Sequence, residues 1–160
     1  MKTKLFLLSL LAVTLFSCQE EEKPATFLEG SFDSSLPNEV AFTVNTMTFQ
    51  KNGSLMVERF MSIGDTKELC LLNYQVGTYS LANDQFIFNV NESYGPDPLT
   101  FYGGCPGKDA LVSQLNAEPL TLKGTLVLSN SKKEFLLDYQ CSELLPYICL
   151  EPKKFELSIL

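Results

Sequence analysis

The chain has 160 residues, a net charge of −7 and neither histidine nor tryptophan. An acidic chain repels phosphate backbones, so we expect no nucleic acid among its partners. The lack of histidine excludes Ser-His-Asp and Cys-His nucleophiles and the usual catalytic zinc sites. We therefore expect a protein that is not an enzyme and that holds no metal or cofactor.

The N-terminus places two lysines before an apolar run, residues 5–16, that ends in Ser17-Cys18. This order is typical of a secretory signal, and the run is too short for a membrane-spanning helix. The ending Leu15-Phe16-Ser17-Cys18 resembles a lipobox, the cleavage motif of bacterial lipoproteins. The resemblance implies that residues 1–17 are removed and that Cys18 carries acyl chains, such as palmitate, that anchor the protein in the outer membrane.

Residues 18–26 follow as a tether that contains the acidic run Glu20-Glu21-Glu22. A solvated tether explains this composition on its own. The run also resembles the surface-export signal of lipoproteins in some Gram-negative bacteria, which implies the cell surface rather than the periplasmic face. Residues 27–160 have the length of a single domain.

Beyond Cys18, four cysteines remain: Cys70, Cys105, Cys141 and Cys149. An even number in an exported chain indicates two disulfides, for which three pairings exist. Cys141 and Cys149 flank a short loop that is easily bridged, which leaves Cys70 to pair with Cys105. Free or metal-binding thiols are the alternative, although no C-x-x-C pair supports it.

Short runs rich in β-branched and aromatic residues, separated by turn residues, predict strands along the rest of the chain. Asn52-Gly53 between two such runs predicts a hairpin. Asn83-Asp84 predicts a further turn, and Phe86, Phe88 and Val90 alternate onto one face of the next strand. The other predicted strands cover residues 40–49, 55–63, 69–81, 120–128, 134–141 and 155–160.

The middle of the chain differs, because glycine and proline are dense between residues 93 and 109. We expect a long loop there, followed by a short helix from Asp109 to Leu115. Eight or nine short strands with hairpin-sized connections predict an all-β fold. The natural architectures are an antiparallel up-and-down β-barrel or, as the alternative, a β-sandwich.

Three stretches together resemble small bacterial lipocalin-like domains. They are Leu28-Glu29-Gly30-Ser31-Phe32, the hairpin at residues 47–55, and Tyr74–Leu81 with the strand that follows it. The resemblance covers residues 27–91, and Phe32 stands where tryptophan is usual in the opening motif. It implies a closed barrel that holds one small apolar ligand.

Six aromatic residues on the predicted strands are candidates to line such a lumen: Phe42, Phe60, Phe86, Phe88, Phe135 and Tyr139. Aromatic residues on alternating strands also form ordinary core, so both interpretations stay open. Arg59, the only arginine, alternates with Leu55, Val57 and Met61. A bulge or the strand edge is expected to turn Arg59 to solvent, and a ligand-binding arginine is the alternative.

Two functions follow from these observations. The first is a non-catalytic lipoprotein that binds a small apolar or amphipathic ligand in its barrel. The second is an extracellular module with a packed core that contacts a protein or glycan through the loops at residues 93–109 and 142–147. A hydrolase is the weakest alternative, since no nucleophile motif is present.

Overall fold

The computed structural model describes residues 28–37, 42–62, 68–99, 104–114, 120–140 and 152–158. Their regular elements are nine strands and one short 3-10 helix, which run in chain order: β1 (Gly30–Pro37), β2 (Phe42–Phe49), β3 (Ser54–Ser62), β4 (Leu69–Ala82), β5 (Gln85–Gly95), η2 (Lys108–Ala110), β6 (Val112–Ser113), β7 (Leu120–Leu128), β8 (Glu134–Tyr139) and β9 (Lys153–Leu157).

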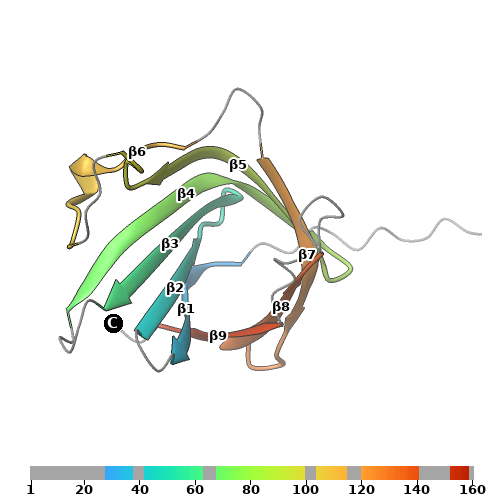
Figure 1. Ribbon diagram of the computed structural model, residues 1–160. Coiled ribbons are helices and arrows are strands. Elements are labelled where there is room, and N and C mark those ends of the chain that lie inside the picture. Colours follow the sequence, from blue (N-terminus) through green and yellow to red (C-terminus); the bar gives the residue numbers. More distant parts are fainter. Residues whose placement is uncertain are drawn as a thin grey trace, which may run out of the picture.

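All strand pairs are antiparallel, and eight strands close into a ring in the order β1-β2-β3-β4-β5-β7-β8-β9. Closure comes from β1, which pairs with β9 through Phe32 opposite Leu157. Figure 1 shows the barrel viewed along its axis, with β6 and η2 outside it beside β4 and β5. The up-and-down barrel is therefore confirmed, and the sandwich alternative is wrong because the sheet leaves no edge between β1 and β9.

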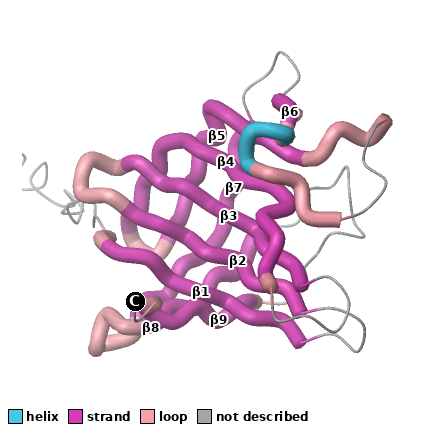
Figure 2. Tube along the Cα trace, turned by 90° about the vertical axis from the view of Figure 1, so that its left-hand side faces the viewer, coloured by secondary structure: helices cyan, strands magenta, loops and turns pink. Residues whose placement is uncertain are grey.

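One end of the barrel carries tight turns, and we call it the turn end (Figure 2). Asn83 and Asp84 link β4 to β5 with φ values of 50° and 64°, the conformation of a two-residue hairpin. Gly53 has a φ of 82° and donates its amide to the carbonyl of Gln50 at 3.0 Å, which closes the predicted Asn-Gly hairpin. The opposite end, which we call the mouth, carries the connections β1–β2, β3–β4, β5–β7 and β8–β9.

The hydrophobic core fills the half of the barrel nearest the turn end. Phe135 packs against several aromatic rings of the core. The centre of its ring lies 5.1 Å from that of Phe32 and 4.9 Å from that of Phe155. The buried core residues are Leu28, Phe32, Met47, Phe49, Leu55, Tyr79, Leu81, Phe86, Phe88, Val90, Leu126, Phe135, Leu137 and Phe155. Because they come from all eight ring strands and from Leu28, the core ties the ring together across its axis.

Three expectations about element boundaries need correction. The helix expected from Asp109 to Leu115 is wrong, because a 3-10 turn spans Lys108–Ala110 and Val112 then pairs with Gly95 in β6. Strand β5 continues to Gly95, inside the segment expected to be a loop. The last strand begins at Lys153 rather than Phe155, a shift that matters for the interior.

Candidate functional site

The six aromatic candidates divide between the two faces of the barrel wall. Phe86, Phe88 and Phe135 point inward and are at most 2% exposed, so they form the core of the turn end. Tyr139 also points inward, because it lies opposite Gly124, which in turn lies opposite the buried Phe86. It is half-buried and packs against the edge of that core.

Phe42 and Phe60 do not line the interior. On β2, the buried residues Thr43, Met47 and Phe49 set the inward face, and Phe42 alternates away from them with 43% of its surface exposed. Phe60 lies opposite Val44 and alternates away from the buried Leu55. Successive side chains of a strand point to opposite faces, so these two aromatic rings belong to the outer wall.

The inward positions nearer the mouth carry a different set of side chains. Arg59 lies opposite Asn45 and Asn73, and Val57 lies opposite Gln75, which faces Ser93 in turn. Lys153 lies opposite the buried Leu137, so it also points inward. We call this set the polar mouth; its members are Thr43, Asn45, Val57, Arg59, Asn73, Gln75, Ser93, Leu122, Tyr139 and Lys153.

The inward-facing residues of the polar mouth are less buried than those of the turn end. Among its members only Thr43 is buried, and Arg59 is exposed, whereas every core residue of the turn end is buried. Val57 and Leu122 are partly exposed although they face the lumen and pack against the core. The inward face is therefore fully buried near the turn end and only partly buried toward the mouth.

Arg59 keeps its inward direction because the irregularity in pairing falls beyond it. The register of β3 against β4 shifts between Arg59 and Phe60, where β4 contains one extra residue. Arg59 is exposed to solvent, as expected, but its alternation with Leu55 and Val57 places it on the inward face rather than the outer wall. Arg59 also acts electrostatically on Lys153, as expected for two cations that share the lumen.

Burial and the positive charge of Arg59 lower the pKa of Lys153 below its ordinary value of 10.5. Neither cation has a carboxylate within ion-pairing distance in the described parts of the chain, where all four ion pairs join other residues. Burial raises the pKa of Tyr139 to about 12, so its hydroxyl stays protonated and can donate a hydrogen bond at neutral pH.

The sequence singled out Arg59 but not Lys153 or the polar residues around them. Lys153 stands two residues before Phe155, a spacing that places both side chains on one face of a strand. This spacing would have identified Lys153 as an inward-facing residue, but the last strand was expected to begin only at Phe155.

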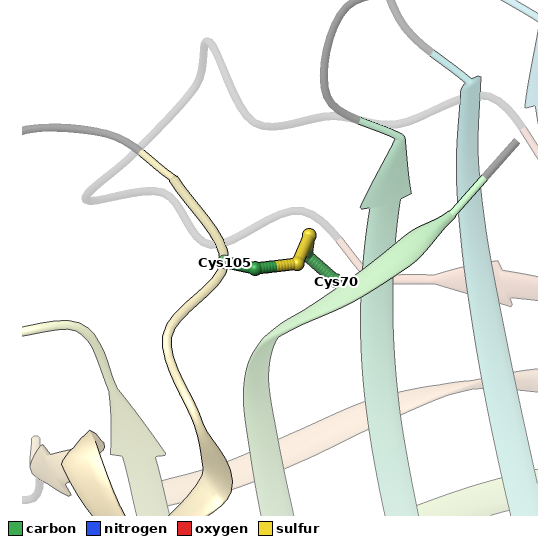
Figure 3. Close-up of a disulfide and its surroundings, with 2 residues drawn as sticks. All are labelled: Cys70 and Cys105. Carbon is green, nitrogen blue, oxygen red and sulfur yellow. A yellow bond between two sulfur atoms is a disulfide. The ribbon is translucent and has the colours of Figure 1, made fainter. Parts of the chain in front are cut away.

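Outside the barrel, a disulfide fastens the segment at residues 104–114 to β4 (Figure 3). Cys70 and Cys105 are joined with their Cα atoms 5.1 Å apart, which confirms this predicted pairing. Lys108 then lies 4.7 Å from the centre of the Tyr74 ring, and Tyr74 stacks on Tyr94 at 4.8 Å. These contacts hold the segment on the outer faces of β4 and β5.

Several predicted features lie outside the described residues: the lipid site Cys18, the cysteines Cys141 and Cys149, and the loop at 142–147. Among the residues that the structure does describe, no three histidine, cysteine or acidic side chains form a set that could hold a metal ion. The described part of the chain also contains no helix long and apolar enough to cross a membrane.

Comparisons with protein-family models, with curated proteins and with solved structures found no match to this chain.

Proposed function

We propose that this chain is a non-catalytic lipoprotein, anchored by Cys18 in the outer membrane, whose barrel binds a small apolar or amphipathic ligand. One observation carries the proposal: inward-facing side chains of the polar mouth are accessible to solvent above a fully packed floor. A binding site of this kind combines apolar walls with a few polar groups that orient the ligand.

The shape of the interior limits the ligand. Phe86, Phe88 and Phe135 occupy the turn end completely, so only the part above them is available. Leu28 covers the floor from the turn end, with its amide and carbonyl both bonded to the hydroxyl of Tyr79. The ligand therefore enters and leaves through the mouth, and its size is limited to the depth above the aromatic floor.

Native mass spectrometry of the mature protein purified from its own host tests this function. A small molecule bound at one copy per chain, recovered by extraction, is the expected result. A mass that corresponds to the chain alone, together with no binding of added amphiphiles, would contradict the proposal.

Anchoring and location are tested separately. Globomycin, which blocks cleavage of lipoprotein signals, should cause the uncleaved precursor to accumulate. On intact cells, an added protease should degrade the protein if it lies on the cell surface, as the acidic run after Cys18 implies. Survival of the protein until the cells are permeabilised would place it on the periplasmic face.

A second function has one observation in its favour. Leu99 is 82% exposed, and Val112 is 40% exposed on the segment that the Cys70–Cys105 disulfide holds. Exposed apolar side chains are typical of a surface that contacts a protein or glycan. Leu99→Ser should then abolish capture of the partner and leave occupancy of the barrel unchanged.

A further inference from the structure

The distribution of charge between the two faces of the barrel wall is uneven. The chain contains 19 acidic and 12 basic residues, and acids are frequent on its strands. Yet the acids of the described strands all alternate with inward residues and lie on the outer face: Asp33, Glu58, Glu92, Glu134, Asp138 and Glu156. The inward face of these strands carries two charges, and both are positive.

The two cations come from different parts of the ring. Arg59 lies on β3 and Lys153 on β9, which are separated in the ring by β1 and β2. Since both side chains point into the lumen, the guanidinium and the ammonium group approach each other from different walls. Their mutual repulsion contributes to the lowered pKa of Lys153.

Such an arrangement is unfavourable for the empty barrel. A partly buried cation loses hydration, and a second cation nearby adds repulsion, with no described carboxylate to offset either effect. An anion between the two groups would remove both penalties. Arginine is suited to this role because its planar fork binds a carboxylate through two parallel hydrogen bonds.

The residues around the cations define the rest of the ligand. Asn45 and Asn73 flank Arg59 and can donate hydrogen bonds to a polar head. Val57 and Leu122 face the same lumen, pack on the aromatic core and remain partly exposed. A ligand that matches this lining has an anionic head and an apolar body.

We propose that the polar mouth binds an amphiphilic carboxylate, with its head held between Arg59 and Lys153 and its apolar body against Val57 and Leu122. This inference rests on the ligand-binding function proposed above and names the chemical class of the ligand.

Isothermal titration calorimetry with decanoate and with decan-1-ol, each below its micelle concentration, tests the proposal. The two probes share one alkyl chain and differ only in the head. The protein is the chain from residue 19 onward, which retains every described element. We expect decanoate to bind at least about tenfold more tightly than the alcohol, since charge-assisted hydrogen bonds are the strong ones.

The variants Arg59→Met and Lys153→Met keep an apolar stem and remove one charge each. Each should weaken decanoate binding about tenfold and leave the affinity for the alcohol unchanged. The matched control is Lys154→Gln, which removes the same charge from the neighbouring position on the outer face. If either methionine variant does not fold, Arg59→Lys and Lys153→Arg keep the charge and should retain most of the binding.

The outcomes separate the two proposals. If the alcohol binds as tightly as decanoate, or if the two methionine variants bind decanoate like the wild type, ligand binding stands and the carboxylate inference is wrong. If neither probe binds, the ligand-binding function itself is overturned.

Discussion

The hydroxyl of Tyr79 makes two hydrogen bonds with the backbone of Leu28, 51 residues away in the sequence. It accepts a bond from the amide at 2.7 Å and donates one to the carbonyl at 2.9 Å. Leu28 and Tyr79 are both buried, so one phenol satisfies two backbone groups that water does not reach. The segment before β1 is thereby fixed across the turn end of the barrel.

Tyr79→Phe should therefore lower the free energy of unfolding by about 1–3 kcal/mol, because it leaves the buried amide and carbonyl of Leu28 without this partner. Urea denaturation measures the loss. Tyr139→Phe is the control: Tyr139 also points inward, but its hydroxyl has no hydrogen bond to the described parts of the chain, so stability should change little. Equal losses in the two variants would contradict the role assigned to the Tyr79 hydroxyl.

The division of the aromatic residues between core and outer wall predicts a contrast between two alanine variants. Phe88 is fully buried in the core, and Phe88→Ala should destabilise the protein by about 3–5 kcal/mol. Phe42 lies on the outer wall, and Phe42→Ala should lower stability by less than about 1 kcal/mol. Thermal unfolding followed by circular dichroism measures both; similar losses would mean that the assignment of faces is wrong.

Gly77 marks a place where the barrel wall tolerates no side chain. It lies beside the register shift between β4 and β5, and an added Cβ would overlap the carbonyl oxygen of Asn89. Gly77→Ala should cost about 2 kcal/mol or more, because backbone rather than a flexible side chain must move. Gly107→Ala is the control, since its Cβ would meet no atom within 4 Å. A Gly77→Ala variant as stable as Gly107→Ala would show that the two strands can separate without loss.

The strands and turns were predictable because their signals are local. The alternation of Phe86, Phe88 and Val90 and the pair Asn83-Asp84 each act over a few residues, and the structure follows them. Closure of the barrel had no such signal. It depends on Phe32 pairing with Leu157, and the sequence near either residue does not specify its partner.

The functional residues were predicted less well for two different reasons. Phe60 was chosen for its aromatic ring, although its alternation with Leu55 already placed it on the opposite face. Arg59 was expected to reach solvent at a bulge or the strand edge, and it is exposed beside a bulge. Because the extra residue lies in β4 and follows Arg59 in the pairing, Arg59 stays on the inward face. Neither the position of a bulge nor the strand that carries it is encoded in the alternation of a single strand.

The disulfide between Cys70 and Cys105 spans 35 positions of the sequence and should add to stability by restricting the unfolded chain. The chain-entropy relation gives a contribution of about 3–4 kcal/mol for a loop of this length. The double variant Cys70→Ser/Cys105→Ser should lose stability of this order in urea denaturation. A midpoint unchanged from that of the oxidised wild type would show that the contacts of Lys108 and Tyr74 hold the segment without the covalent link.

Lys153 should lower the stability of the ligand-free protein, because burial and Arg59 both disfavour its charged form. A basic group whose pKa is lower in the folded state favours the unfolded state while it is protonated. The effect is present at neutral pH and disappears as the pH rises from the lowered folded value to the ordinary value of 10.5.

Lys153→Met should accordingly stabilise the empty barrel at pH 7, and the gain should be modest because solvent screens this half-buried position. The gain should shrink as the pH approaches 10.5. The other ionisable groups on the inward face change little below that pH, because arginine stays charged and burial raises the pKa of both Tyr79 and Tyr139. Thermal unfolding of both proteins across this range measures the difference. A methionine variant less stable than the wild type at pH 7 would mean that Lys153 has a structural role. A gain in stability together with a loss of decanoate binding would mean that Lys153 serves ligand binding at a cost in stability.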